Sequence, residues 1–336
     1  MPLRRRTSRV LTLLATVGLL APTLTSCTSD SAIQVYSARH YDLEQAFELF
    51  HEETGTDVEF LFGSDAELRE RIAAEGKNTI ADVYITVDAG NLAAAAEQGI
   101  FQPVQSETLD RAVPQGLRDP KGRWYALAKR VRTIIYAPDR VSPGDLSTYA
   151  ALAEPQWKGR LCLRSATASY TQSLVAAMLA ENGEAETERI VKGWADNARI
   201  FSNDAEIIEN VASGNCEVAI VNHYYLARKL RDKPDLPVEL FWADQDSGGV
   251  HVNISGGGVV AESDNPEGGQ QLLEWLATDG QAELVGDNLE YPVNPEVEME
   301  ELLASWGDFE EQKLDATAYA DRNSDAVALL GRVGYE

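Results

Sequence analysis

An α/β fold with two lobes is predicted by three features of the sequence. Strand-like and helix-like segments alternate along the chain, which is the pattern of α/β proteins. The chain has 336 residues, enough for two lobes that each bury a hydrophobic core. No internal repeat and no low-complexity linker interrupts it, so we expect ordered strands to cross from one lobe to the other.

Residues 1–26 have the features of a bacterial signal peptide. Four arginines precede the apolar run VLTLLATVGLLAPTL, which is too short to span a membrane comfortably. The run leads into LTSC, which resembles a lipobox and predicts that Cys27 is lipidated and becomes the mature N-terminus. Residues 27–31 would then be a lipidated tether. An ordinary signal peptide or a short membrane anchor is the alternative.

The strongly acidic charge excludes one class of partner. The formal net charge is −25, and the first 26 residues carry four positive charges, so the remainder carries −29. Such a surface repels phosphate backbones and anionic headgroups, so we expect no nucleic-acid partner and no membrane contact beyond the lipid anchor. An acidic proteome gives the same charge, so it indicates little else about function.

In the first part of the chain the sequence predicts three successive strand–helix units. Apolar periodicity and Gly stops place these elements at 32–38, 41–55, 57–63, 64–76, 81–87 and 89–99. In the first helix Leu43, Phe47 and Phe50 recur on one face, and the second opens with the capping-box pattern Ser64-x-x-Glu67.

The second part begins with a long alternating strand at 122–141 that we expect to pass between the lobes. Further strands are predicted at 157–165, 216–222 and 249–262, with helices at 168–183, 186–198 and 203–215 and a mostly helical region from 265 onward. We assign lobe 1 to 32–130, lobe 2 to 131–250, a return to lobe 1 to 251–304, and C-terminal helices packing on lobe 2 to 305–336. The GGG at 256–258 lacks a GxGxxG context, so it indicates close backbone approach or a bend rather than a nucleotide loop.

Two cysteines remain once Cys27 is set aside. Cys162 and Cys216 lie in strand-like runs, in a compartment that permits disulfides. Neither has a CxxC partner or a neighbouring histidine, which disfavours a metal or redox pair. We expect a disulfide between neighbouring strands, and two free buried thiols are the alternative.

Tyrosines gather where predicted strands end and helices begin. Tyr41 beside His40, Tyr170, and the pair Tyr224 and Tyr225 occupy three such turns. Ligands of open α/β sheets bind beyond the carboxyl ends of strands. Phenols with an imidazole suit a hard cation such as Fe³⁺, and without a thiolate cluster Zn²⁺ and Cu(I) are disfavoured. Ordinary packing and an aromatic cage for an organic cation remain alternatives.

A family resemblance favours the metal interpretation. The stretches VYSARHYD, WKGRLCLRSATASYTQSLVA and GNCEVAIVNHYYLARKL, in this order, resemble the tyrosine-rich branch of the ferric-iron-binding substrate-binding proteins of bacterial ABC transporters. The likeness covers nearly the whole mature chain. It implies a periplasmic-binding-protein type II fold, a two-lobed Venus flytrap with hinge strands.

The resemblance also implies a set of metal ligands. His40 and Tyr41 would come from the first lobe, and Tyr170, Tyr224 and Tyr225 from the second. Fe(III) would be the transported ligand, with water or carbonate as a possible co-ligand.

The same resemblance implies charge compensation around the ligands. Arg39 and Arg228 are the leading candidates for balancing phenolate charge, and Arg130 and Arg132 are weaker ones because strands near a hinge often carry structural salt bridges. We expect His223, which precedes the tyrosine pair, to be exposed rather than a donor to the ligands.

The implied function is capture of ferric iron outside the cytoplasm and its delivery to ABC permease subunits. The protein would be a monomeric lipoprotein at the cell surface or in the periplasm, and not an enzyme. The same fold binding thiamine or a polyamine is the alternative function. An enzyme with a catalytic tyrosine is disfavoured because GxSxG, HExxH, P-loop and paired-carboxylate motifs are missing from the sequence.

Overall fold

The computed structural model describes residues 32–39, 43–313 and 315–336. The signal peptide, Cys27, His40 and Tyr41 lie outside the described residues. The strands are β1 (Ile33–Ser37), β2 (Val58–Phe62), β3 (Val83–Val87), β4 (Tyr125–Tyr136), β5 (Leu161–Arg164), β6 (Ala198–Phe201), β7 (Val218–Asn222), β8 (Glu239–Phe241) and β9 (Val252–Val259). The α-helices are α1 (Leu43–Thr54), α2 (Asp65–Glu75), α3 (Ala89–Glu97), α4 (Glu107–Ala112), α5 (Ser169–Asn182), α6 (Glu184–Asn197), α7 (Asp204–Ala212), α8 (His223–Asp232), α9 (Pro266–Leu276), α10 (Gln281–Gly286), α11 (Glu301–Ala304), α12 (Ala316–Ala320) and α13 (Asn323–Arg332).

The first lobe follows the predicted alternation of strand and helix. Strands β2, β1 and β3 pair in parallel, and each of β1, β2 and β3 is followed by a helix, α1, α2 and α3. The Ser64 hydroxyl accepts a hydrogen bond from the Glu67 backbone N–H at 3.3 Å, so the predicted cap begins α2. The three predicted strand–helix pairs are confirmed. They could be predicted because amphipathic periodicity and caps depend only on neighbouring residues.

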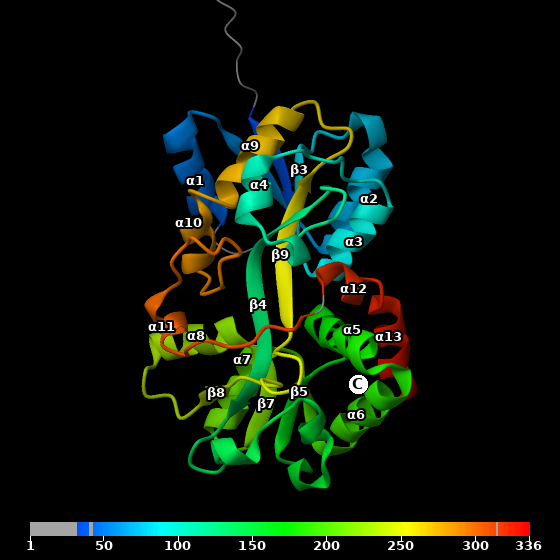
Figure 1. Ribbon diagram of the computed structural model, residues 1–336, viewed down its shortest axis with the longest axis vertical. Helices are drawn as coiled ribbons and strands as arrows, with labels where there is room; N and C mark the ends of the chain where they lie inside the picture. The colour runs from blue at the N-terminus through cyan, green and yellow to red at the C-terminus, as the bar shows by residue number, and fades with distance from the viewer. Residues whose placement is uncertain (1–31, 40–42, 314) are drawn as a thin grey trace, which may run out of the picture. The chain divides into compact units, whose positions relative to one another are not determined.

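Strand β4 runs from the first lobe into the second, and β9 lies beside its first half (Figure 1). The first half of β4 pairs antiparallel with β9, and its second half pairs with β7 and β8. On its other side β9 pairs with β3 of the first lobe. The predicted crossing strands are therefore confirmed, and β4 is the longest strand of the described chain.

The triple glycine lies inside β9, where neighbouring strands come close. A Cβ on Gly258 would meet the Arg123 carbonyl oxygen and lie 2.6 Å from the Phe101 ring, and one on Gly256 would meet the Tyr125 carbonyl oxygen. The prediction of close backbone approach is confirmed. Glycine is needed at these two positions because a Cβ would overlap neighbouring backbone carbonyl oxygens.

The second lobe is built on the order β4-β7-β5-β6. Strands β5, β6 and β7 are parallel, and α5 and α8 leave the carboxyl ends of β5 and β7. Cys162 in β5 and Cys216 just before β7 form a disulfide with their Cα atoms 5.9 Å apart. Short β6 and β8 were not predicted, because strands of four and three residues carry too little periodicity to be recognised.

The region from residue 265 onward is less helical than predicted. Between Asp287 and Gln312 only α11 is an α-helix, and the preceding stretch contains Pro292 and Pro295, which disfavour helical backbone. Helix α13 packs against α5, and α12 packs against both α3 and α5 (Figure 1). Of the described helices, none combines the length and the apolar content that crossing a membrane requires.

A chain of buried hydrogen bonds ties β9 to both lobes. The Asn253 amide donates to the Asp88 carboxylate at 2.6 Å and to the Ser173 hydroxyl at 3.0 Å. The Ser173 oxygen lies 3.1 Å from Nε2 of His251, whose Nδ1 lies 2.8 Å from Oε1 of Gln312. Asp88 caps α3 and Ser173 lies in α5, so the chain joins these two helices through β9.

We predict that Gly258→Ala destabilises the fold. The added methyl must displace strand backbone, so the free energy of unfolding should fall by roughly 1–3 kcal/mol, as overpacking does elsewhere. The control is Gly116→Ala, because a Cβ at Gly116 meets nothing within 4 Å. Urea unfolding of both variants checks the prediction, and equal midpoints would contradict it.

We predict that His251 contributes to the pH dependence of stability. Burial lowers the pKa of His251 to about 4, so below pH ~6.5 the unfolded chain takes up a proton that the folded chain does not. Stability is therefore lost as the pH falls from about 6.5 towards 4. In His251→Gln this slope should be smaller by up to about 1.4 kcal/mol per pH unit.

Urea unfolding at a series of pH values measures that slope. His51→Gln is the control, because His51 is exposed in the folded chain and meets solvent in both states. An unchanged slope in His251→Gln would show that His251 is not the titrating group.

Candidate metal site

Three of the predicted ligand tyrosines lie together at one edge of the second-lobe sheet. Tyr170 is the second residue of α5, and Tyr224 and Tyr225 are the second and third residues of α8. Because β5 and β7 are parallel neighbours, the helices that follow them begin side by side. The Tyr224 hydroxyl donates to the Tyr170 hydroxyl at 3.4 Å, and the rings of Tyr224 and Tyr225 are 4.4 Å apart. The structure therefore brings these three phenols together.

The three phenols differ in exposure. Tyr224 is buried, with 1% of its surface exposed, whereas Tyr170 and Tyr225 are half-buried. Burial raises the pKa of Tyr224 well above 10, and the neighbouring Tyr170 and Tyr225 add to the effect. The Asn222 amide donates to the Tyr224 oxygen at 3.4 Å. Without a bound cation, Tyr224 is therefore a neutral phenol at physiological pH.

Two of the four arginines assigned to charge compensation contact a tyrosine, and a third, Arg132, pairs with Asp204 instead. Arg130 donates to the Tyr170 hydroxyl at 3.3 Å, and its guanidinium carbon lies 5.3 Å from the ring centre. Arg228 lies 5.1 Å from the centre of the Tyr224 ring. Both distances are those of cation–π contacts.

Arg39 instead forms an ion pair with a residue that the sequence did not single out. Its guanidinium is buried and lies 2.7 Å from the Glu290 carboxylate, which is also 4.0 Å from Arg130. Arg228 in turn donates to the Asn288 side chain at 2.7 Å. The segment after α10 thus contacts three of the four arginines. It carries no motif, so only its position in the fold identifies it.

Arg164 is a further cation that sequence reasoning missed. It ends β5, and its guanidinium carbon lies 5.2 Å from the centre of the Tyr170 ring. The signal available in the sequence is its place in LCLRS, where a charged residue follows an apolar strand at the edge that carries Tyr170.

The expectation that His223 is exposed is wrong. His223 is fully buried, and its Nδ1 accepts a hydrogen bond from the Val131 backbone N–H at 3.1 Å. At this point β4 changes partner, since Val131 pairs with β9 and Arg132 with β7. The histidine supplies an acceptor for an N–H that would otherwise be buried without one. Burial lowers its pKa to about 3, so the ring is neutral.

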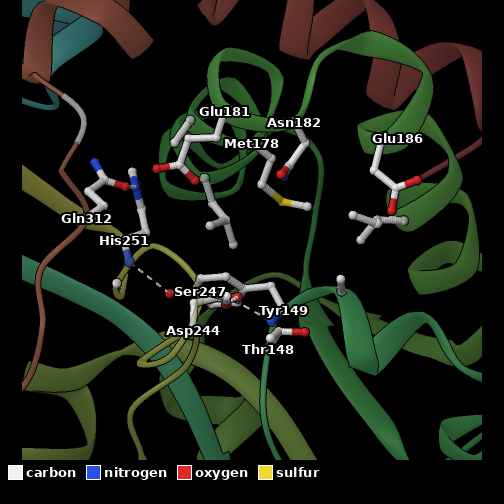
Figure 2. A pocket seen from close by; sticks show the side chains of 15 residues that line it. Thr148, Tyr149, Met178, Glu181, Asn182, Glu186, Asp244, Ser247, His251 and Gln312 are labelled. Atoms are coloured by element: carbon white, nitrogen blue, oxygen red, sulfur yellow. Dashed lines mark hydrogen bonds between the residues drawn. The ribbon is translucent and has the colours of Figure 1, made fainter.

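A separate pocket of about 230 Å³ lies elsewhere in the second lobe (Figure 2). Its walls come from α5, the start of α6 and the loop around Asp244, and Glu181, Met178 and His251 face it. None of the three tyrosines lines this pocket. Within the described ranges, no group of three or more His, Cys, Asp or Glu side chains could hold a metal. The tyrosine cluster is therefore the better candidate for a hard cation.

The cluster combines oxygen ligands with nearby positive charge. Phenol oxygens are hard donors, and they bind a metal ion once its charge has displaced their protons. Arg130, Arg164 and Arg228 surround the rings and would offset the negative charge of phenolates. Such a site suits a small, highly charged cation.

Comparisons with known proteins agree with this chemistry. The family model "Bacterial extracellular solute-binding protein" matches residues 78–310. Iron uptake protein A1 of Synechocystis is 39% identical over 90% of this chain and 87% of its own length. The major ferric iron-binding protein of Neisseria meningitidis is 27% identical over 94% of this chain and 97% of its own.

Solved structures show the same fold. The Trichodesmium IdiA (FutA) protein in complex with iron and citrate ligands superimposes with a TM-score of 0.87 at 40% identity, covering 91% of this chain and all of that one. Apo FutA2 from Synechocystis gives 0.85 at 37% identity, covering 91% of this chain and 99% of that one. The predicted two-lobed type II binding-protein fold is confirmed. From the family match and these relatives, the chain belongs to the bacterial extracellular solute-binding proteins.

Proposed function

We propose that this protein binds Fe(III) outside the cytoplasm and delivers it to an ABC permease for import. The observation that carries the proposal is the meeting of Tyr170, Tyr224 and Tyr225 at the carboxyl ends of β5 and β7. Support comes from relatives named for iron uptake and ferric iron binding.

The proposed ligands are the three phenols of the second lobe together with His40 and Tyr41. In the sequence His40 and Tyr41 directly follow Arg39, and both lie outside the described residues. Fe³⁺ displaces the phenol protons, as bound metals do with other ligands. Four phenolates on Fe³⁺ would carry a net charge of −1, which Arg130 and Arg228 offset at close range. Water or carbonate would complete the coordination.

The fold provides a means of capture and release. Because β4 and β9 connect the lobes, bending of these strands would close the first-lobe ligands onto an ion held by the second lobe. The closed form would be the one that the permease recognises. We further propose that the protein acts as a monomer and is anchored through lipid on Cys27, the last residue of the lipobox-like LTSC.

The alternative ligands have less support. The relatives described above are named for iron, and none of them for thiamine or a polyamine. They are uptake and binding proteins rather than enzymes. An organic cation does not displace phenol protons as a metal ion does, so the rings would stay neutral and the positive charge of the surrounding arginines would not be offset.

We predict a visible phenolate-to-iron charge-transfer band when the purified protein is loaded with ferric citrate. The band should give an orange or red colour, and Tyr224→Phe/Tyr225→Phe should lose most of it, because phenylalanine offers no oxygen to the metal. Absorbance titration with ferric citrate measures both the band and the affinity.

Tyr136→Phe is the matched control. Its hydroxyl donates to Glu239 at 2.5 Å on β8, away from the cluster, so the band should persist. An unchanged spectrum in the double variant would disprove the ligand assignment. A colourless wild-type protein that takes up no iron would overturn the proposed function.

We also predict that Cys27→Ala releases the protein from the membrane. The thiol of Cys27 would be the attachment point of the lipid, and without it the chain should appear in the soluble extracytoplasmic fraction. Fractionation of cells producing the full chain, with Cys162→Ala/Cys216→Ala as the control, measures this. Retention of Cys27→Ala in the membrane would show that the N-terminus is held in another way.

A further inference from the structure

Arg164 belongs to no recognised sequence motif. It lies between the tyrosine cluster and the core of the second lobe. Its backbone belongs to β5 and pairs with Phe201 of β6. Its carbonyl oxygen accepts a hydrogen bond from the Tyr335 hydroxyl at 2.8 Å. The main chain of Arg164 is therefore fixed on both sides, and the side chain starts from a rigid point.

A fully buried carboxylate holds the guanidinium. Asp204, the first residue of α7, lies 3.7 Å from Nη1 of Arg164 and 3.2 Å from Nη1 of Arg132. Asp204 also accepts a hydrogen bond from the Asn222 backbone N–H at 3.1 Å. Asn222 directly precedes α8, so one carboxylate fixes Arg164 and the start of the helix that carries Tyr224 and Tyr225.

The guanidinium faces the phenols with unused hydrogen-bonding capacity. Its carbon lies 5.2 Å from the Tyr170 ring centre, and it interacts electrostatically with Tyr225. Within the part of the chain that the structure describes, Nε and Nη1 of Arg164 are buried and have no hydrogen-bond acceptor. A buried donor without an acceptor is unfavourable, so these N–H groups would gain from negative charge on a neighbouring phenol oxygen.

We propose that Arg164 is a positioning residue of the iron site, which holds Tyr170 in place and offsets the negative charge of the metal-bound oxygens. The proposal rests on the proposed function. Arg164 contacts Tyr170 and interacts electrostatically with Tyr225. Because a guanidinium is a donor with no acceptor atom, it acts through the tyrosines and not on the metal.

The test compares Arg164→Gln with Arg160→Gln in the full-length mature protein. Arg160 is a matched control in the same lobe: its guanidinium lies 5.0 Å from the Trp157 ring centre and pairs with Glu217, so its loss removes the same two kinds of contact away from the tyrosines. Ferric citrate titration gives the affinity and the charge-transfer spectrum of each variant, and urea unfolding gives its stability.

Arg164→Gln should weaken ferric affinity by about tenfold or more, the size of one partly buried cation–π contact and charge. Its charge-transfer band should move to longer wavelength, because losing a positive charge close to the ring raises the energy of the phenolate electrons more than that of the more distant metal. Arg160→Gln should keep both the affinity and the band. A purely structural role for Arg164 would lower stability without moving the band.

Arg164→Lys provides a second measurement that does not depend on the glutamine variant folding. It keeps the charge but loses the planar stacking, so it should bind iron more weakly than Arg160→Gln while its band stays near the wild-type position. Affinity and spectrum equal to wild type in the folded Arg164 variants would overturn the proposal. If the wild-type protein itself shows no band, the proposed function fails instead, so the two failures are distinguishable.

Discussion

The antiparallel pairing of β4 with β9 is the constraint on which the rest of this structure depends. β9 also pairs with β3, and β4 continues into the second lobe to pair with β7 and β8. The β4–β9 pair therefore connects the sheets of the two lobes. The glycines at 256–258 keep β9 close to its neighbours, where any side chain would push the strands apart. β4 positions Arg130 beside Tyr170, and His251, directly before β9, lies beside Ser173 of α5.

Four arginines near the site form two groups, each built around one carboxylate, and both groups contact Tyr170. In the first, Glu290 lies between Arg39 and Arg130, and in the second, Asp204 lies between Arg132 and Arg164. Tyr170 contacts one arginine of each group. Burying an ion is unfavourable unless it is paired, and each carboxylate here serves two guanidinium groups. Each group thus retains about one net positive charge beside the phenols, where an anionic metal complex would offset it.

Part of the site followed directly from the sequence. A strand, a turn and a helix N-terminus recur at Tyr170 and at Tyr224, and parallel neighbours bring such turns to one edge of a sheet. The arginine partners did not follow. Glu290 and Asn288 lie on an irregular stretch far along the chain from Arg39 and Arg228, and no local pattern links them. His223 was misassigned for the same reason, since its burial depends on the change of strand partner at Val131.

The sequence by itself determined the longer helices and strands of this protein and the kind of chemistry at its strand ends. Hydrophobic periodicity, caps and glycines are properties of neighbouring residues, so they act before any tertiary contact forms. Only the tertiary structure decided which charged side chains are buried together. It placed both Arg164 and Arg130 against the Tyr170 ring, and it placed three arginines in contact with the segment after α10. Those contacts join residues distant in sequence, and their energies depend on burial and on the distance between charges, which the order of residues does not specify.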